Sequence, residues 1–117
     1  MQILRGDVFL VDFNSSKAAD SQIVGSEMLK QRPGVVLSGN AINRVRRTVI
    51  VVQLSTAPSP VEIFAVPVPS AGVLSVAVCD QVTAVNKATR LVRKLGTLST
   101  ADLKAVEAGL KDALDLI

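Results

Sequence analysis

The chain has 117 residues, 49% of them hydrophobic and 3% aromatic, and its formal net charge is +3. This length predicts one domain spanning residues 1–117. The apolar runs are far shorter than the roughly 20 residues that cross a bilayer, and the first residues do not resemble a secretory signal. The single cysteine excludes an internal disulfide and favours a reducing compartment. We therefore expect a soluble, cytoplasmic protein with no membrane partner.

Histidine is absent from the chain, which excludes histidine acid–base pairs, serine triads and cysteine–histidine dyads. A zinc site would have to combine Cys79 with scattered carboxylates, which is not a ligand pattern that zinc sites use. The scarcity of aromatic residues also argues against a nucleic-acid site built mainly on base stacking. The sequence predicts no metal and no cofactor.

Short apolar runs separated by turn residues predict a mainly β protein. The polar segment 14–31 is long for a loop in a small domain, which is typical of a functional loop. Turn residues at 39–43 are expected to lead into a basic turn at 44–47. Further along the chain we expect a break at 57–60, a turn at 70–72 and a short helical turn at 86–90. Gly96 is expected to mark a bulge. The expected strands are 6–13, 34–38, 48–54, 62–68, 73–78 and 91–98.

The C-terminal segment has the clearest helical pattern. Ser99 is a candidate N-cap, and Asp102 follows at the spacing of a capping-box acid. A hydrophobic stripe at helical spacing follows, formed by Leu103, Val106, Leu110, Ala113, Leu114 and Ile117. The fold class expected is mainly β with a C-terminal helix (α+β), as a small antiparallel barrel or curled sheet.

Arg32 stands between a long polar segment and a buried strand. Pro33 fixes the backbone directly after it and biases Arg32 toward extended geometry, so the guanidinium is expected to face outward. Arg32 is therefore either a surface arginine at a loop end or an anion-binding group on a rigid base. Basic residues also cluster at 44–47 and 90–94, which indicates either a polyanion partner or a solvated surface.

Several short sequence blocks occur in a fixed order along nearly the whole chain. They are Arg5-Gly6-Asp7-Val8, Gly25-Ser26-Glu27, Gln31-Arg32-Pro33, Val35-Val36-Leu37-Ser38, Asn40, Asn43-Arg44, Thr48-Val49-Ile50-Val51, Leu54-Ser55, Asp80-Gln81-Val82 and Leu95-Gly96-Thr97-Leu98-Ser99. No single block is specific, but in this order they resemble the MazF/PemK family, the toxins of type II toxin–antitoxin modules.

The resemblance implies an SH3-like barrel of the MazF/PemK/CcdB type that works as a homodimer. It also implies a metal-independent endoribonuclease that cleaves single-stranded RNA, chiefly mRNA, at a specific sequence and inhibits growth. The implied partner is a cognate antitoxin with an acidic C-terminal segment that folds on binding. Two alternatives stay open: a non-enzymatic DNA gyrase inhibitor like CcdB, disfavoured because the chain has no tryptophan, and a catalytically inactive binding module.

Three positions match the family's catalytic residues. Arg32 aligns with the arginine that stabilises charge on the phosphate during attack by the ribose 2′-hydroxyl. Ser55 aligns with a catalytic hydroxyl that is more often threonine. Glu27 matches an acid that acts as a general base, orients Arg32, or forms a structural salt bridge.

The candidate RNA-binding residues lie around these positions. Asn40, Asn43 and Gln81 are base-edge contacts or turn residues. The arginines at 44, 46 and 47 are phosphate contacts or part of a solvated turn. Asp80 is an RNA contact or has a structural role. The chain departs from the family in a loop before Gly25 that is longer by roughly 7 residues, and in Met28-Leu29-Lys30 where relatives carry glycines. The full candidate set is Gln31, Asn40, Asn43, Arg44, Arg46, Arg47, Thr56, Asp80 and Gln81.

Overall fold

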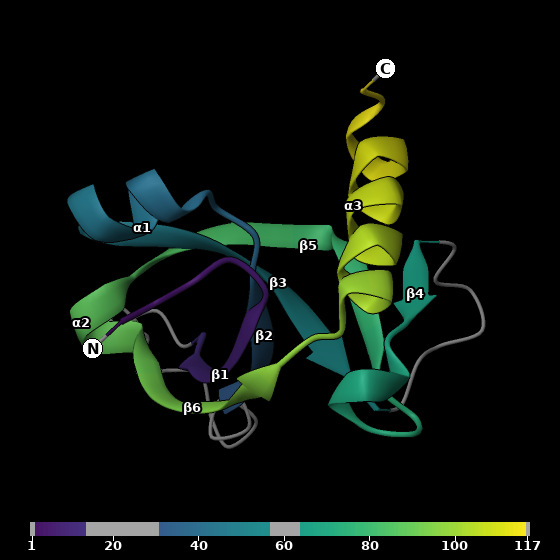
Figure 1. Ribbon diagram of the computed structural model, residues 1–117, viewed down its shortest axis with the longest axis horizontal. Coiled ribbons are helices and arrows are strands. Elements are labelled where there is room, and N and C mark those ends of the chain that lie inside the picture. The colour runs from purple at the N-terminus through teal and green to yellow at the C-terminus, as the bar shows by residue number, and fades with distance from the viewer. Residues whose placement is uncertain (1, 14–30, 57–63, 117) are drawn as a thin grey trace, which may run out of the picture.

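The computed structural model describes residues 2–13, 31–56 and 64–116. Its helices α1 and α2 lie at one end of the molecule, and the long helix α3 stands beside the sheet at the other (Figure 1). The strands are β1 (Asp7–Asp12), β2 (Gln31–Val36), β3 (Thr48–Ser55), β4 (Ala65–Pro67), β5 (Val76–Asn86) and β6 (Leu91–Thr97). The helices are α1 (Asn40–Val45), α2 (Lys87–Arg90), α3 (Thr100–Leu114) and the 3₁₀ turn η3 (Pro69–Ala71).

The six described strands form one sheet in the order β4-β5-β3-β2-β1-β6, with every neighbouring pair antiparallel. The expected fold class, a mainly antiparallel sheet with a C-terminal helix, is confirmed. The sheet is not closed into a barrel, because β4 and β6 remain as its two edges. It is strongly curled instead, and the long strand β5 runs along its whole width in Figure 1.

Each face of the sheet buries its own core, since side chains alternate between the two faces of a strand. We call these the helix-side core, which includes Val106 of α3, and the far-side core. The helix-side core contains Val8, Val35, Leu37, Val52, Leu54, Val68, Ala77, Cys79, Leu98 and Val106. The far-side core contains Ile3, Phe9, Val11, Val36, Val49, Val51, Val85 and Leu91.

Helix α3 begins where its capping residue predicts. The Ser99 hydroxyl accepts a hydrogen bond from the Asp102 N–H at 3.1 Å, which satisfies one of the free donors of the first turn. The Asp102 carboxylate accepts from the Ser70 N–H at 2.8 Å, so it also ties the helix to η3. In the predicted stripe, Val106 is fully buried and Leu103, Leu110 and Ala113 pack on the helix-side core. Leu114 is largely exposed, and Ile117 lies outside the described residues.

Several element boundaries differ from the expectation. Strand β2 begins at Gln31, because it pairs with β1 as far as Asp12. The expected turn at 39–47 contains the helix α1. Strand β5 continues to Asn86, since its second half pairs with β3. Strand β4 is only three residues long, and part of the expected strand 62–68 lies outside the described residues, as does the loop 14–30 and the break 57–60.

The remaining elements match the sequence pattern. The short helix α2 follows Asn86, whose side chain accepts from the N–H groups of Ala88 and Thr89. A register shift between β1 and β6 lies beside Gly96, where a bulge was expected. Of the helices that the structure describes, none combines the length and the hydrophobicity needed to cross a bilayer.

Candidate functional site

Arg32 and Ser55 lie at the same end of two paired strands, β2 and β3. The register between these strands pairs Gly34 with Gln53. The ladder ends at this pair, and Arg32 and Ser55 each lie two residues beyond it, toward the same end of the two strands. The strand order therefore places the candidate guanidinium and the candidate hydroxyl, which are 23 positions apart in the sequence, at one end of the β2–β3 pair.

Both residues also belong to one face of the sheet. Arg32 has the same strand parity as Val36, and Ser55 the same parity as Val51; both valines belong to the far-side core. Arg32 is exposed and Ser55 is half-buried. The pair therefore lies at the rim of the far-side core, where the strands end and solvent begins.

Gly34 allows close packing beside the candidate site. A Cβ at Gly34 would lie 3.2 Å from Val11 Cγ2 and 3.5 Å from Phe13 Cζ. Phe13 also packs against the far-side core. Because a glycine allows this close approach, the Phe13 ring lies over β2 one strand repeat from Arg32. The sequence analysis did not single out either residue, since nothing in a lone glycine or phenylalanine indicates their contact.

The Arg32 guanidinium faces solvent with no carboxylate beside it among the residues that the structure describes. Its strand neighbour Gln31, also exposed, pairs with Asp12 of β1. Asp12 in turn lies 3.9 Å from Arg90 at the end of α2. An arginine in this setting has its two parallel N–H donors available to a phosphate.

Asp80 and Gln81 lie in an irregular part of β5. The register pairs Val52 with Val82 but Leu54 with Ala77, so three extra residues of β5 bulge opposite Gln53. Asp80 and Gln81 are both exposed in this bulge, two strand positions from Ser55. Bulges of this kind often re-aim side chains next to active sites.

The thiol of Cys79, the residue before Asp80, is not a candidate nucleophile. Cys79 is fully buried, and its burial, together with the charge of Asp80, raises the pKa of its thiol to about 11. The thiol stays protonated near neutral pH, and the reactive species of a cysteine is the thiolate. Its hydrogen-bond contacts are backbone oxygens, including that of Val106 at 3.7 Å.

The candidates of α1 lie at the opposite end of β3. This strand has eight residues, so at about 3.3 Å per residue its two ends are about 23 Å apart. Arg44, Arg46 and Arg47 are exposed there. Thr56 is exposed at the Ser55 end. Glu27 lies outside the described residues.

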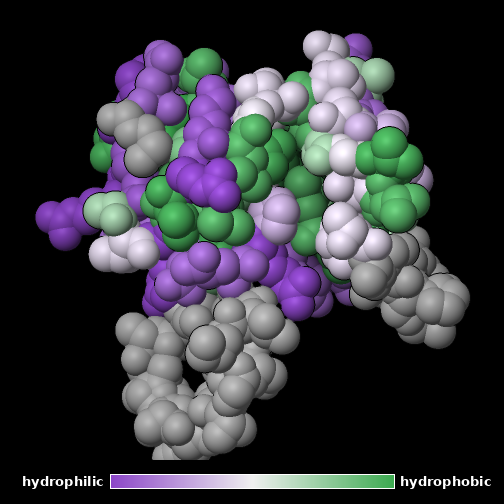
Figure 2. Space-filling model, turned by 90° about the horizontal axis from the view of Figure 1, so that it is seen from below, coloured by the Kyte–Doolittle hydropathy of each residue, from purple (hydrophilic) through white to green (hydrophobic). Residues whose placement is uncertain are grey.

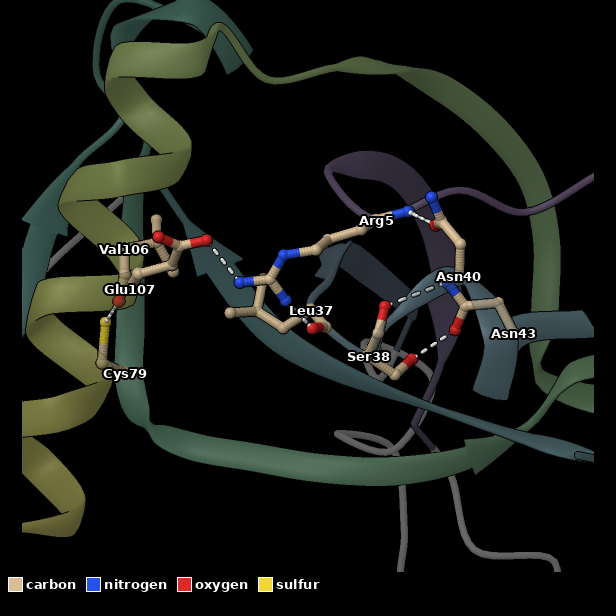
Figure 3. Close-up of polar contacts among 8 residues, drawn as sticks. All are labelled: Arg5, Leu37, Ser38, Asn40, Asn43, Cys79, Val106 and Glu107. Carbon is tan, nitrogen blue, oxygen red and sulfur yellow. Dashed lines mark hydrogen bonds and ion pairs between the residues drawn. The ribbon is translucent and has the colours of Figure 1, made fainter. Parts of the chain in front are cut away.

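The two asparagines of α1 have structural contacts, as Figure 3 shows. Asn43 is only 3% exposed, and its side chain bonds to the hydroxyl and the carbonyl of Ser38. A buried amide with these partners does not reach a base edge, so we remove Asn43 from the RNA-contact candidates. The Asn40 side chain is exposed and accepts from the Arg5 N–H at 2.7 Å.

Arg5 joins α3 to the rest of the sheet. Its guanidinium donates to the Leu37 carbonyl and to the Glu107 carboxylate, across the space between β2 and α3 (Figure 3). The Arg-Gly-Asp block of the sequence therefore has a structural role at Arg5. Asp7 of the same block is buried, accepts from Thr97 Oγ1 at 3.1 Å and lies 3.4 Å from Lys94 Nζ.

Solved structures share this architecture at low sequence identity. An endoribonuclease from a mycobacterial species matches with a TM-score of 0.75 and 24% identity, over 99% of this chain and 94% of that chain. MazF from Deinococcus radiodurans matches with a TM-score of 0.76 and 21% identity, over 99% of both chains. A mycobacterial endoribonuclease in complex with its cognate antitoxin matches with a TM-score of 0.73 and 24% identity, over 99% of this chain and 96% of that chain.

These structures define the class: a curled antiparallel sheet with a C-terminal helix, shared with MazF. A family model for PemK-like, MazF-like toxins of type II toxin–antitoxin systems matches residues 4–114. The chain belongs to this toxin family, as the sequence blocks indicated.

Proposed function

We propose that this toxin is a metal-independent endoribonuclease that cleaves single-stranded RNA, chiefly mRNA, at a specific sequence and thereby inhibits growth. The observation that carries the proposal is that Arg32 and Ser55 lie at the same end of β2 and β3, at the rim of the far-side core. The family assignment and the endoribonucleases among the solved structures support it. The chain works in the cytoplasm, where its substrate is.

In the proposed reaction the ribose 2′-hydroxyl attacks the adjacent phosphorus. The new P–O bond forms a 2′,3′-cyclic phosphate, the bond to the 5′-oxygen breaks, and the leaving 5′-oxygen takes a proton from water. Negative charge builds on the phosphoryl oxygens, and the Arg32 guanidinium donates two hydrogen bonds to them. Ser55 donates a third from the neighbouring strand. Loss of one such preorganised donor typically lowers the rate about 100- to 1,000-fold.

The 2′-hydroxyl proton needs an acceptor, and the described residues around Arg32 offer few. Asp80 stands in the β5 bulge near Ser55, and Glu27 precedes β2 in the sequence. We assign Glu27 as the base or as the residue that orients Arg32. Gln31, Thr56, Asp80 and Gln81 are exposed around the pair, and in this proposal they contact the bound RNA.

We further propose that the toxin forms a homodimer. We also propose that it binds the acidic C-terminal segment of a cognate antitoxin. One similar structure is an endoribonuclease in complex with its cognate antitoxin, and another is MazE–MazF from Deinococcus radiodurans. An acidic chain would be attracted to the exposed Arg32 and would compete with RNA for it. In this proposal the antitoxin inhibits RNA cleavage because it occupies the Arg32 site.

The test is cleavage of a long unstructured RNA with a chelator present, followed by mapping of the product 5′ ends. We expect cuts at one short recurring motif. Arg32→Ala should lower the cleavage rate about 100-fold or more with an unchanged melting temperature, since Arg32 is exposed. Arg32→Lys keeps the charge but loses the paired donors, so it should remain strongly impaired. Lys104→Ala on α3 is the matched surface control.

Full cleavage by a folded Arg32→Ala variant would refute the role of Arg32. If the wild-type toxin cuts no RNA at all, the proposal fails and a non-enzymatic toxin becomes the better explanation. A gyrase supercoiling assay would then test the CcdB-like alternative.

A further inference from the structure

Two described stretches of this chain carry basic residues and no acidic ones. The described stretches 31–56 and 81–101 contain no acidic residue, whereas α3 and its C-cap carry four. In Figure 2, which views the molecule from below, hydrophilic residues gather on the left, the side of α1 and α2 in Figure 1. The cations of these two stretches are Arg32, Arg44, Arg46, Arg47, Lys87, Arg90, Arg93 and Lys94.

Helix α2 begins against the arginines of α1. The Lys87 N–H donates to the Arg47 carbonyl at 2.8 Å, and the Lys87 ammonium donates to the Asn43 carbonyl at 2.6 Å. The ammonium thereby holds the last turn of α1, with two of its three N–H groups left to other acceptors. Lys87 and Arg47 are therefore fixed side by side.

The other end of α2 reaches the neighbourhood of Arg32. Leu91, directly after α2, pairs with Val11 of β1, and Val11 pairs with Arg32 on its other side. Two strand spacings of about 4.8 Å place Leu91 about 10 Å from Arg32. Arg90 precedes Leu91 and therefore lies at this end of β1, where it is 3.9 Å from Asp12.

We propose that α2 carries an RNA-binding track that runs from the cleavage site to α1, and that it holds the phosphates of RNA flanking the cut. We call this the basic track: Arg32, Arg90, Lys87, Arg47, Arg46 and Arg44. The inference rests on the proposed ribonuclease function and adds a second binding region to it. It predicts that the toxin favours long RNA over a short RNA with the same cut site.

The electrostatics of the track favour a polyanion over a single anion. Arg44, Arg46 and Arg47 are all exposed within four residues, and the ion pairs of the described residues do not include them. Closely spaced like charges repel one another, and a row of phosphates removes this repulsion and releases counterions. RNA is the polyanion that the other end of the track already binds in the proposed function.

The experiment compares two RNAs that share one cut site, one trimmed to a few nucleotides on each side and one with long unstructured flanks. The variant is Arg46→Ala/Arg47→Ala, and the matched control is Lys104→Ala/Lys111→Ala, which removes two exposed cations of α3. The readout is the ratio of kcat/KM for the long RNA to kcat/KM for the short RNA. We expect the ratio to fall in the arginine variant and to stay constant in the control.

Salt dependence gives a second readout that does not require cleavage. Binding of the long RNA is measured with Arg32→Ala as the background, by fluorescence anisotropy at several salt concentrations. Single-stranded contacts contribute about 0.7 each to the slope of log K against log salt, so losing two should lower the slope by about 1.4. Melting curves confirm that each variant is folded.

An unchanged ratio together with an unchanged slope would overturn the basic track. An equal fall in the control would overturn it too, because it would show a general charge effect. Binding of this end to anionic lipid vesicles, with no loss of long-RNA binding in the arginine variant, would reject RNA as the partner. Failure of the ribonuclease proposal is a separate result, recognised by a wild-type toxin that cuts neither RNA.

Discussion

Each face of the sheet buries a hydrophobic core, but the two cores end differently. The helix-side core is sealed by α3, whose Val106 is fully buried, and its rim is held by Arg5 and Glu107. Among the described residues no long helix lies over the far-side core, and its strands end at the exposed Arg32 and the half-buried Ser55. The candidate site therefore lies where a packed strand pair ends, on the face away from α3. There, rigid backbone and accessible polar groups coincide.

The largest expected effect comes from creating a cavity in the far-side core. Phe9 is fully buried, and Phe9→Ala should lower the free energy of unfolding by about 3–5 kcal/mol. Phe9 pairs with Gly34 on β2, so the cavity would also loosen the strand that carries Arg32. Urea unfolding measures the first effect, and cleavage by the fraction that remains folded measures the second.

The matched change in the helix-side core is Val106→Ala. It should destabilise the chain without a comparable loss of cleavage by the folded fraction. Equal losses of cleavage in the two variants would break the distinction between the faces.

A smaller effect is expected from overpacking beneath α3. A Cβ at Gly109 would lie 2.6 Å from Val66 Cγ2 and 2.8 Å from Cys79 Sγ, closer than packed atoms tolerate. Gly109→Val should therefore cost about 1–3 kcal/mol of stability, visible as a lower melting temperature. Ala108→Val, at the exposed neighbouring position, carries the same β-branched side chain without the clash. Similar melting temperatures for these two variants would contradict the close packing of α3.

Much of this fold follows from local sequence signals. Short apolar runs locate β1, β3 and β6, and the Ser99 cap with the stripe behind it locates α3. The errors occur where distant pairing decides the structure. The start of β2 at Gln31 depends on β1, and the length of β5 depends on β3. In α1, the buried bonds between Asn43 and Ser38 hold a helix where the composition indicates a turn.

The candidate site shows the same division. Pro33 and the strand behind it predict an outward-facing Arg32, and Arg32 is exposed. Its position at the same end of the sheet as Ser55 follows from the antiparallel pairing of β2 and β3, which no local pattern specifies. The approach of Arg90 to Asp12 is likewise a result of β1 lying between β2 and β6. A sequence indicates which side chains suit a chemistry, whereas the sheet order decides which of them meet.

The smallest expected effect is a pH dependence confined to the helix side. Hydrogen bonds from the hydroxyl and the N–H of Ser70 lower the pKa of Asp102 from its ordinary 3.8. A carboxyl with a lowered pKa stabilises the folded state above its unfolded pKa, and this contribution is lost as the pH falls through the folded pKa.

Asp102→Asn should therefore lose less stability than the wild type between about pH 5 and pH 3, measured by urea unfolding. Asp112→Asn, which removes an exposed carboxylate of the same helix, is the control. Because Asp102 ties α3 to η3 and lies on the side of the sheet away from Arg32, RNA cleavage at neutral pH should be the same in both variants. A loss of cleavage in Asp102→Asn alone would show that the helix side and the site are coupled.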